Sequence, residues 1–191
     1  RGFRVGTPGP LTNWVPVHAD AFGNLFNLPA VLGFAVAGRV FGANMGLVTT
    51  PFATPATTAI VNTTPQAWVR VPDNTAIVPL SAQIVVESTG ITTQGEISVV
   101  IAQNDVGNGT SSAADAGPIS LNTAVPAASN CTVRQDNTAA DSTAPTNPLE
   151  LKRFSFAVSA VDQLFRWSVD GDGLYLPVLR GPATWAIYVG G

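Results

Sequence analysis

The sequence predicts an all-β fold, an antiparallel β sandwich preceded by an extended N-terminal arm, and two observations lead to this prediction. First, Gly, Pro, Thr and Asn interrupt every window long enough to hold the apolar spacing of an amphipathic helix. Second, several short segments alternate apolar and polar residues with the period of two that a strand requires. Short strands joined by irregular connections favour two sheets packed around one apolar core.

The alternation is clearest in three segments, at residues 96–103, 153–159 and 184–189. Every second residue in them is apolar, so we expect that face of each strand to point inward. The expected inward residues are Ile97, Val99, Ile101, Phe154, Phe156, Val158, Trp185, Ile187 and Val189. Further strands are predicted between turn-forming residues, at 66–71, 81–87, 131–134, 163–169 and 174–179.

Asp170-Gly171-Asp172-Gly173 has two interpretations. Alternating carboxylates resemble part of a calcium-binding loop, but the third acidic position and the distal Glu of that motif are missing. Asp-Gly pairs are also typical of tight turns, so we expect a hairpin between Val169 and Leu174 rather than a metal site.

The length of 191 residues fits a single β-sandwich domain, expected at residues 30–191, after an N-terminal arm or inter-subunit segment at residues 1–29. Val31–Phe41 and Leu47–Thr49 are candidates for additional strands of the sandwich. Two long connections of low complexity, Asn104–Asn130 and Gln135–Pro148, are either surface loops without a task or segments that reach a neighbouring subunit or a receptor.

The chain carries few charges. Charged residues make up 11% of it, against roughly 25% in an ordinary soluble domain. A neutral surface favours association, so we expect protein to cover much of it in a homo-oligomer, with a trimer as the expected form. No nucleic-acid partner is expected, because the net charge is −3 and Lys152-Arg153 is the only adjacent basic pair. No membrane partner is expected, because the apolar run Ala30–Ala37 is far too short to span a bilayer.

The segment from Ala21 to Trp68 is the least charged part of the chain, and Arg39 is its only charged residue. Large apolar side chains are spread through it, and a free protein rarely exposes so many together. We therefore expect an interface between subunits in this region. Its candidate residues are Phe22, Leu25, Phe26, Phe34, Phe41 and Phe52.

No group of residues has the pattern of a catalytic, metal or cofactor site, so no enzymatic activity is predicted. His18 is the only histidine and lies far in sequence from the only cysteine, Cys131, which we expect to be a buried strand residue. Carboxylates that could serve a glycoside hydrolase lie in loops with no spacing that selects a pair. They are Asp105, Asp115, Asp136, Asp141 and Glu150.

Five stretches resemble virion proteins of tailed bacteriophages. They are Ala37–Asn44, Val48–Thr50, Ala56–Thr58, Trp68–Leu80 and Pro177–Pro182. The resemblance is greatest to jelly-roll decoration (cement) proteins, which sit on the capsid exterior, often as trimers. It implies a jelly-roll sandwich, a place on the outside of the virion, and the major capsid protein or other virion subunits as partners. It implies no catalytic residues.

Three classes of function therefore compete. The first is a structural virion subunit. The second is a receptor- or glycan-binding head protein of a phage particle, with Trp14, Trp68, Trp167 and Trp185 as the candidate stacking residues. The third, which is the least favoured, is a hydrolase with acidic catalysts. Burial of the tryptophans discriminates between the first two, because an exposed cluster would favour binding.

Overall fold

The computed structural model describes residues 3–5, 15–17, 34–35, 37–44, 59–87, 94–106, 118–124, 128–135, 143–157, 161–169 and 177–190. The chain divides into two compact units. The first holds Arg1–Val40 and Leu121–Ala127, and the second holds Phe41–Ser120 and Ala128–Gly191. The expected end of the arm, after residue 29, lies outside the described residues and stays a prediction.

The all-β prediction is confirmed, since strands dominate the described residues and only Phe34 and Ala35 among them are helical. The strands are β1 (Phe3–Val5), β2 (Val15–Val17), β3 (Phe41–Gly42), β4 (Ala67–Val71), β5 (Ala76–Ile77), β6 (Ser81–Val86), β7 (Gly95–Ala102), β8 (Ile119–Ser120), β9 (Thr132–Gln135), β10 (Leu149–Phe156), β11 (Gln163–Ser168), β12 (Leu179–Arg180) and β13 (Ala183–Gly190). No helix of the described part is long and apolar enough to cross a membrane.

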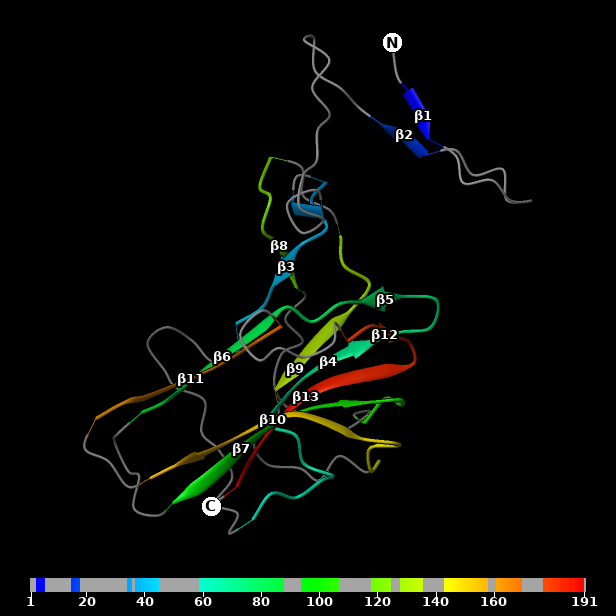
Figure 1. Cartoon of the computed structure of the whole chain (residues 1–191). Coiled ribbons are helices and arrows are strands. Elements are labelled where there is room, and N and C mark those ends of the chain that lie inside the picture. The colour runs from blue at the N-terminus through cyan, green and yellow to red at the C-terminus, as the bar shows by residue number, and fades with distance from the viewer. Residues whose placement is uncertain are drawn as a thin grey trace. The chain divides into compact units, whose positions relative to one another are not determined.

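The second unit is built on a five-stranded antiparallel sheet in the order β10-β7-β13-β4-β9 (Figure 1). Four two-stranded sheets accompany it in the chain: β1–β2, β3–β8, β5–β12 and β6–β11. Several pairings are nested. Strand β4 pairs with β13, β5 and β6 pair with β12 and β11, and β7 pairs with β10, so early strands pair with late ones in reverse order.

One face of the five-stranded sheet is covered by two of the small sheets. Ala82 of β6 and Trp167 of β11 pack on Val99 of β7, and Leu179 of β12 packs with Val71 of β4. The Trp167 and Trp185 rings, which come from opposite layers, lie 5.7 Å apart between centroids. The two layers therefore share one apolar core.

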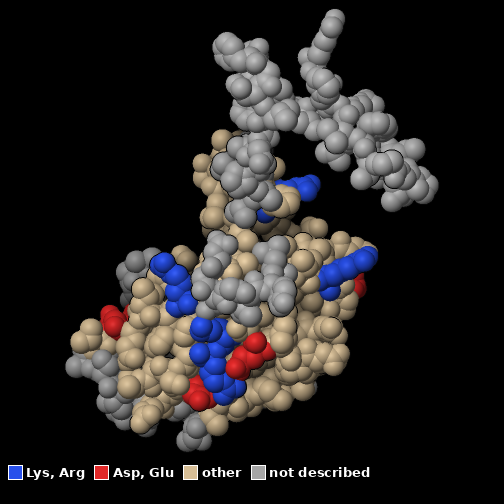
Figure 2. All heavy atoms as spheres, viewed as in Figure 1, with Lys and Arg blue, Asp and Glu red and all other residues tan. Residues whose placement is uncertain are grey.

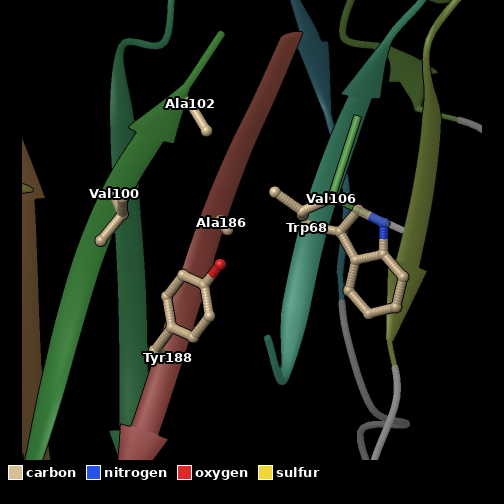
Figure 3. Packing of buried hydrophobic residues seen from close by; sticks show 6 residues of the cluster. All are labelled: Trp68, Val100, Ala102, Val106, Ala186 and Tyr188. Atoms are coloured by element: carbon tan, nitrogen blue, oxygen red, sulfur yellow. The ribbon is translucent and has the colours of Figure 1, made fainter. Parts of the chain in front are cut away.

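The opposite face of the same sheet is also buried, which the sequence did not lead us to expect. Trp68, Val100, Ala186 and Tyr188 pack there with Val106 (Figure 3), and Ile60 joins them from the segment before β4. The predicted inward residues Ile97 and Val99 are buried, but so are their neighbours on the other face. The prediction of a single inward face was wrong for β7 and β13, because segments without regular structure supply a further covering layer.

Four hydrogen bonds, made by the side chains of Thr184 and Asn104 and called here the clasp, hold the segment that follows β7. The buried Thr184 hydroxyl donates to the Asn104 carbonyl (2.8 Å) and accepts from the Val106 amide (3.2 Å). The Asn104 side chain accepts from the Thr146 amide (2.7 Å) and donates to the Ala144 carbonyl (3.1 Å). The residues that follow β7 are thus hydrogen-bonded to the residues that precede β10 and to Thr184 of β13.

The predicted strand at Val31–Phe41 is wrong for the described residues 34–35 and 37–40, which are not in a strand. Phe34 and Ala35 are helical, and the turn ends as the Arg39 amide donates to the Phe34 carbonyl (2.8 Å) and the Gly38 amide donates to the Ala35 carbonyl (3.0 Å). Gly38 has a φ of 70°. These are the bonds and the left-handed glycine of a Schellman motif, which closes a helix. Only Phe41 is in a strand, β3, and Leu47–Thr49 lies outside the described residues.

The predicted hairpin after Val169 is not found among the described pairs. Strand β11 pairs with β6, and β12 pairs with β5, which directly precedes β6 in the chain. Strands β11 and β12 therefore pair in succession with β6 and β5, and not with each other. Residues 170–176, with the Asp-Gly pairs, lie outside the described residues.

Tyr188 is expected to make the stability of the chain sensitive to alkaline pH. Its side chain is 3% exposed, and burial raises its pKa to about 12 from 10.0. An unfolded tyrosine ionises first, so the free energy of unfolding falls as the pH rises from about 10 to about 12, by about 1.4 kcal/mol per unit at most. Tyr188→Phe should remove this loss in chemical denaturation measured across that pH range.

The control is Cys131→Ala, which should keep the tyrosine-dependent loss because only the thiol is removed. At neutral pH, Tyr188→Phe should leave the free energy of unfolding within about 1 kcal/mol of wild type, since the hydroxyl has no hydrogen-bond partner among the described residues. An unchanged alkaline loss in Tyr188→Phe would contradict the assignment to this group.

Candidate functional site

The structure describes two of the six predicted interface residues. Phe34 lies in the first unit with 53% of its surface exposed, and Phe41 lies in the second unit and is partly buried. Phe22, Leu25, Phe26 and Phe52 lie outside the described residues. An interface formed by these six residues therefore stays a prediction.

Other large apolar side chains are exposed as well. Those at least 37% exposed, besides Phe34, are Val61, Val78, Val85, Ile119, Leu121, Leu149, Val161, Leu164 and Val178. Two of them lie directly opposite each other, because Leu164 of β11 pairs with Val85 of β6. The outward face of the β6–β11 sheet, called here the β6–β11 face, thus presents a paired apolar centre to solvent.

Alternation along both strands determines which residues form this face. Ala82 and Trp167 point into the core, so the residues of opposite parity point outward, as their exposure shows. The register arranges the outward side chains in rows across the two strands: Val85 beside Leu164, Gln83 beside Arg166, and Ser81 beside Ser168. The exposed carboxylates Glu87 and Asp162 lie next in the chain, one residue beyond β6 and one residue before β11, at the end of the sheet nearest the apolar row.

The β6–β11 face therefore has an acidic row at one end, an apolar row next to it and a basic row beyond. In the basic row, the Arg166 guanidinium donates to the Gln83 side chain (3.2 Å). An open depression of about 430 Å³ adjoins this row and is lined by Leu80, Ser81, Ala82, Gln83, Arg166 and Ser168. Arg166 gives the depression a positive charge, which suits a carboxylate.

Three of the four candidate stacking tryptophans belong to the core. Trp68 and Trp167 are fully buried, and Trp185 packs between the layers. Trp68 and Trp167 have no exposed surface and so cannot stack on a glycan ring, whereas Trp185 is partly buried. Trp14 lies outside the described residues.

Cys131 is buried as predicted, although it directly precedes β9. Burial raises the pKa of its thiol, which opposes formation of the nucleophilic thiolate, while a hydrogen bond with Ser129 acts in the other direction. His18 lies outside the described residues. Within the part of the chain that the structure describes, no three His, Cys, Asp or Glu side chains gather as a metal site would require.

Two of the five candidate carboxylates are described, and each is paired with an arginine. The prediction that all five lie in loops was wrong for Glu150, which lies in β10. Asp105 forms an ion pair with Arg70. Glu150 accepts hydrogen bonds from Arg153 and from the Ser98 hydroxyl (2.7 Å), and these bonds hold its pKa below the usual value. A general acid of a glycosidase needs a raised pKa, so Glu150 is poorly suited to that role. Asp115, Asp136 and Asp141 lie outside the described residues.

The charged side chains of the described residues are few and grouped. Figure 2 shows a surface on which most described residues are neutral, with Lys and Arg next to Asp and Glu at some points. One such group is Arg153 with Glu96 and Glu150, at 2.8 and 2.7 Å. These pairs are half exposed, so each contributes little to stability.

Comparison with known proteins finds no matching family model, no matching curated protein and no matching solved structure.

Sequence reasoning missed the β6–β11 face, although both strands were predicted. Two signals could have revealed it. In β6, apolar residues occupy both parities, so Val85 cannot share the inward face with Ala82 and Ile84. Before and within β11, Asp162, Leu164 and Arg166 repeat with a period of two, which places opposite charges on either side of one apolar residue on a single face.

Proposed function

We propose that this chain is a structural virion subunit, a capsid decoration (cement) protein that packs on the shell and on copies of itself. The observation that carries the proposal is a β fold with nested strand pairing whose outer layer presents exposed apolar side chains, in a chain with only 11% charged residues. The activity of such a subunit is association, which needs complementary faces and no reactive groups.

The nested pairing supports a jelly roll. A jelly roll arises when a long antiparallel hairpin is rolled up, so that its first strand pairs with its last, its second with the last but one, and so on inward. The pairs β4–β13, β5–β12 with β6–β11, and β7–β10 follow this scheme. The innermost pair of the scheme is not among the described pairs, because β8 pairs with β3 and β9 pairs with β4.

The exposed apolar side chains support association. Val85 and Leu164 are 53% and 57% exposed at directly opposed positions, and Phe34 is exposed in the first unit. Solvation of such side chains is unfavourable, and burying each one between chains contributes roughly 1.5–3 kcal/mol when it becomes fully buried. Charged residues make up only 11% of the chain, so we expect weak electrostatic repulsion between copies.

The virion setting is supported by the resemblance of Ala37–Asn44 and Trp68–Leu80 to decoration proteins. It makes the major capsid protein the second partner, besides further copies of this chain. The burial of Trp68 and Trp167 weighs against the alternative of a glycan-binding head, because it removes two of the four stacking candidates.

The purified chain should therefore be an oligomer at micromolar concentration, with a trimer as the expected species. Sedimentation equilibrium measures the mass directly and distinguishes a trimer from a dimer or a monomer. The physical reason is that apolar side chains left exposed in the monomer become buried between copies. A single species with the mass of one chain across the micromolar range would overturn the proposal.

The second expectation concerns location. Antibodies raised against the folded chain should label the exterior of intact particles of the virus that encodes it, in many copies for each particle. Particles opened to release the genome serve as the control for internal epitopes. Labelling that occurs only after opening would contradict a place on the capsid exterior.

A further inference from the structure

We propose that the β6–β11 face is self-complementary and docks onto the same face of a second copy around a two-fold axis. This inference rests on the proposed self-association and names the surface that performs it. The argument uses the order of charges along the two strands, their register and the depression beside Arg166.

The order of the rows is the first step. The exposed carboxylates Glu87 and Asp162 lie just beyond the strand ends on one side of the apolar pair Val85 and Leu164, and Arg166 lies on the other side. A two-fold axis through the apolar row reverses the strand direction of the second copy. The acidic row of each copy then lies over the basic row of the other, while the apolar rows meet in the middle.

The alternatives fit this pattern less well. A copy docked with its strands running in the same direction would place acid over acid and Arg166 over Arg166, which costs energy when the charges are desolvated. A strongly acidic or basic partner would be repelled at one of the two ends. Opposite charges at the two ends of one apolar centre therefore favour a second copy over a partner of uniform charge.

The depression beside Arg166 is where the acidic side chains of the second copy would bind. It is lined by Arg166, Gln83 and two serines, all groups that donate hydrogen bonds to a carboxylate. In the two-fold arrangement, Glu87 of the second copy approaches this lining. The apolar centre then excludes water from the charge pairs at its two sides, which strengthens them relative to exposed pairs.

A two-fold contact joins copies in pairs. If the expected trimer forms through another surface, this contact links one trimer to the next, and if no other surface associates, it produces a dimer. In either case, the contact adds to the assembled mass, and its removal lowers that mass.

Two charge variants test the proposal through mutual complementation. Variant A carries Arg166→Glu, which makes both charged rows beside the apolar row acidic. Variant B carries Glu87→Lys and Asp162→Lys, which makes both of these rows basic. Each variant alone should self-associate at least about tenfold more weakly than wild type by sedimentation equilibrium, because like charges then meet across the axis. An equimolar mixture of A and B should regain the wild-type mass.

Arg180→Glu is the matched control, since it makes the same charge change at an exposed arginine of β12, beyond the rows that meet at the axis. It should keep the wild-type mass. Circular dichroism of each variant verifies the fold, and Leu164→Ser provides a second route to weaker association without any charge change.

The outcomes separate this inference from the proposed function. If the wild type associates while A, B and Leu164→Ser keep its mass, this face is not the contact and only the inference fails. If A and B lose mass but their mixture does not regain it, the two-fold charge pairing is wrong. A monomeric wild type overturns both the inference and the proposed function.

Discussion

The position of β13 is the constraint on which the rest of the fold depends. This last strand pairs with β4 on one side and with β7 on the other, so the end of the chain lies between two segments from its first half and middle. Both of its faces are covered, by Trp167 and Leu179 on one side and by Trp68 and Val106 on the other. Thr184 of the same strand anchors the segment after β7. The order of the sheet, the two cores and the clasp all depend on this strand.

The β6–β11 sheet packs against β7 and β13 with one face and exposes the other. Because Trp167 and Ala82 must point toward β7 and β13, alternation leaves Val85, Leu164 and Arg166 on the outside. The surface chemistry of the β6–β11 face is therefore a direct consequence of core packing. The exposed pair Val85 and Leu164 is the part of this surface that the proposed association would bury.

Local pattern predicted most of the strands, because alternation is a property of the segment itself. The predicted 66–71, 81–87, 96–103 and 163–169 agree with β4, β6, β7 and β11 within one or two residues. Burial on both faces of β7 and β13 could not be predicted, because it depends on which distant segments cover them. The helix end at Phe34–Arg39 could in principle have been predicted from Gly38, because a glycine after an apolar run is typical of a helix end. The pairing of β12 with β5 could not be predicted either, because no local signal specifies it.

The central claim is that the chain acts by associating with copies of itself, and the dependence of its thermal unfolding on concentration tests this most directly. For a chain whose folded state is stabilised by association, the midpoint of unfolding rises with protein concentration by mass action. Scanning calorimetry or circular dichroism over about a hundredfold range of concentration should show a midpoint that rises by several degrees. A midpoint that stays constant over that range, with reversible unfolding, would contradict the account.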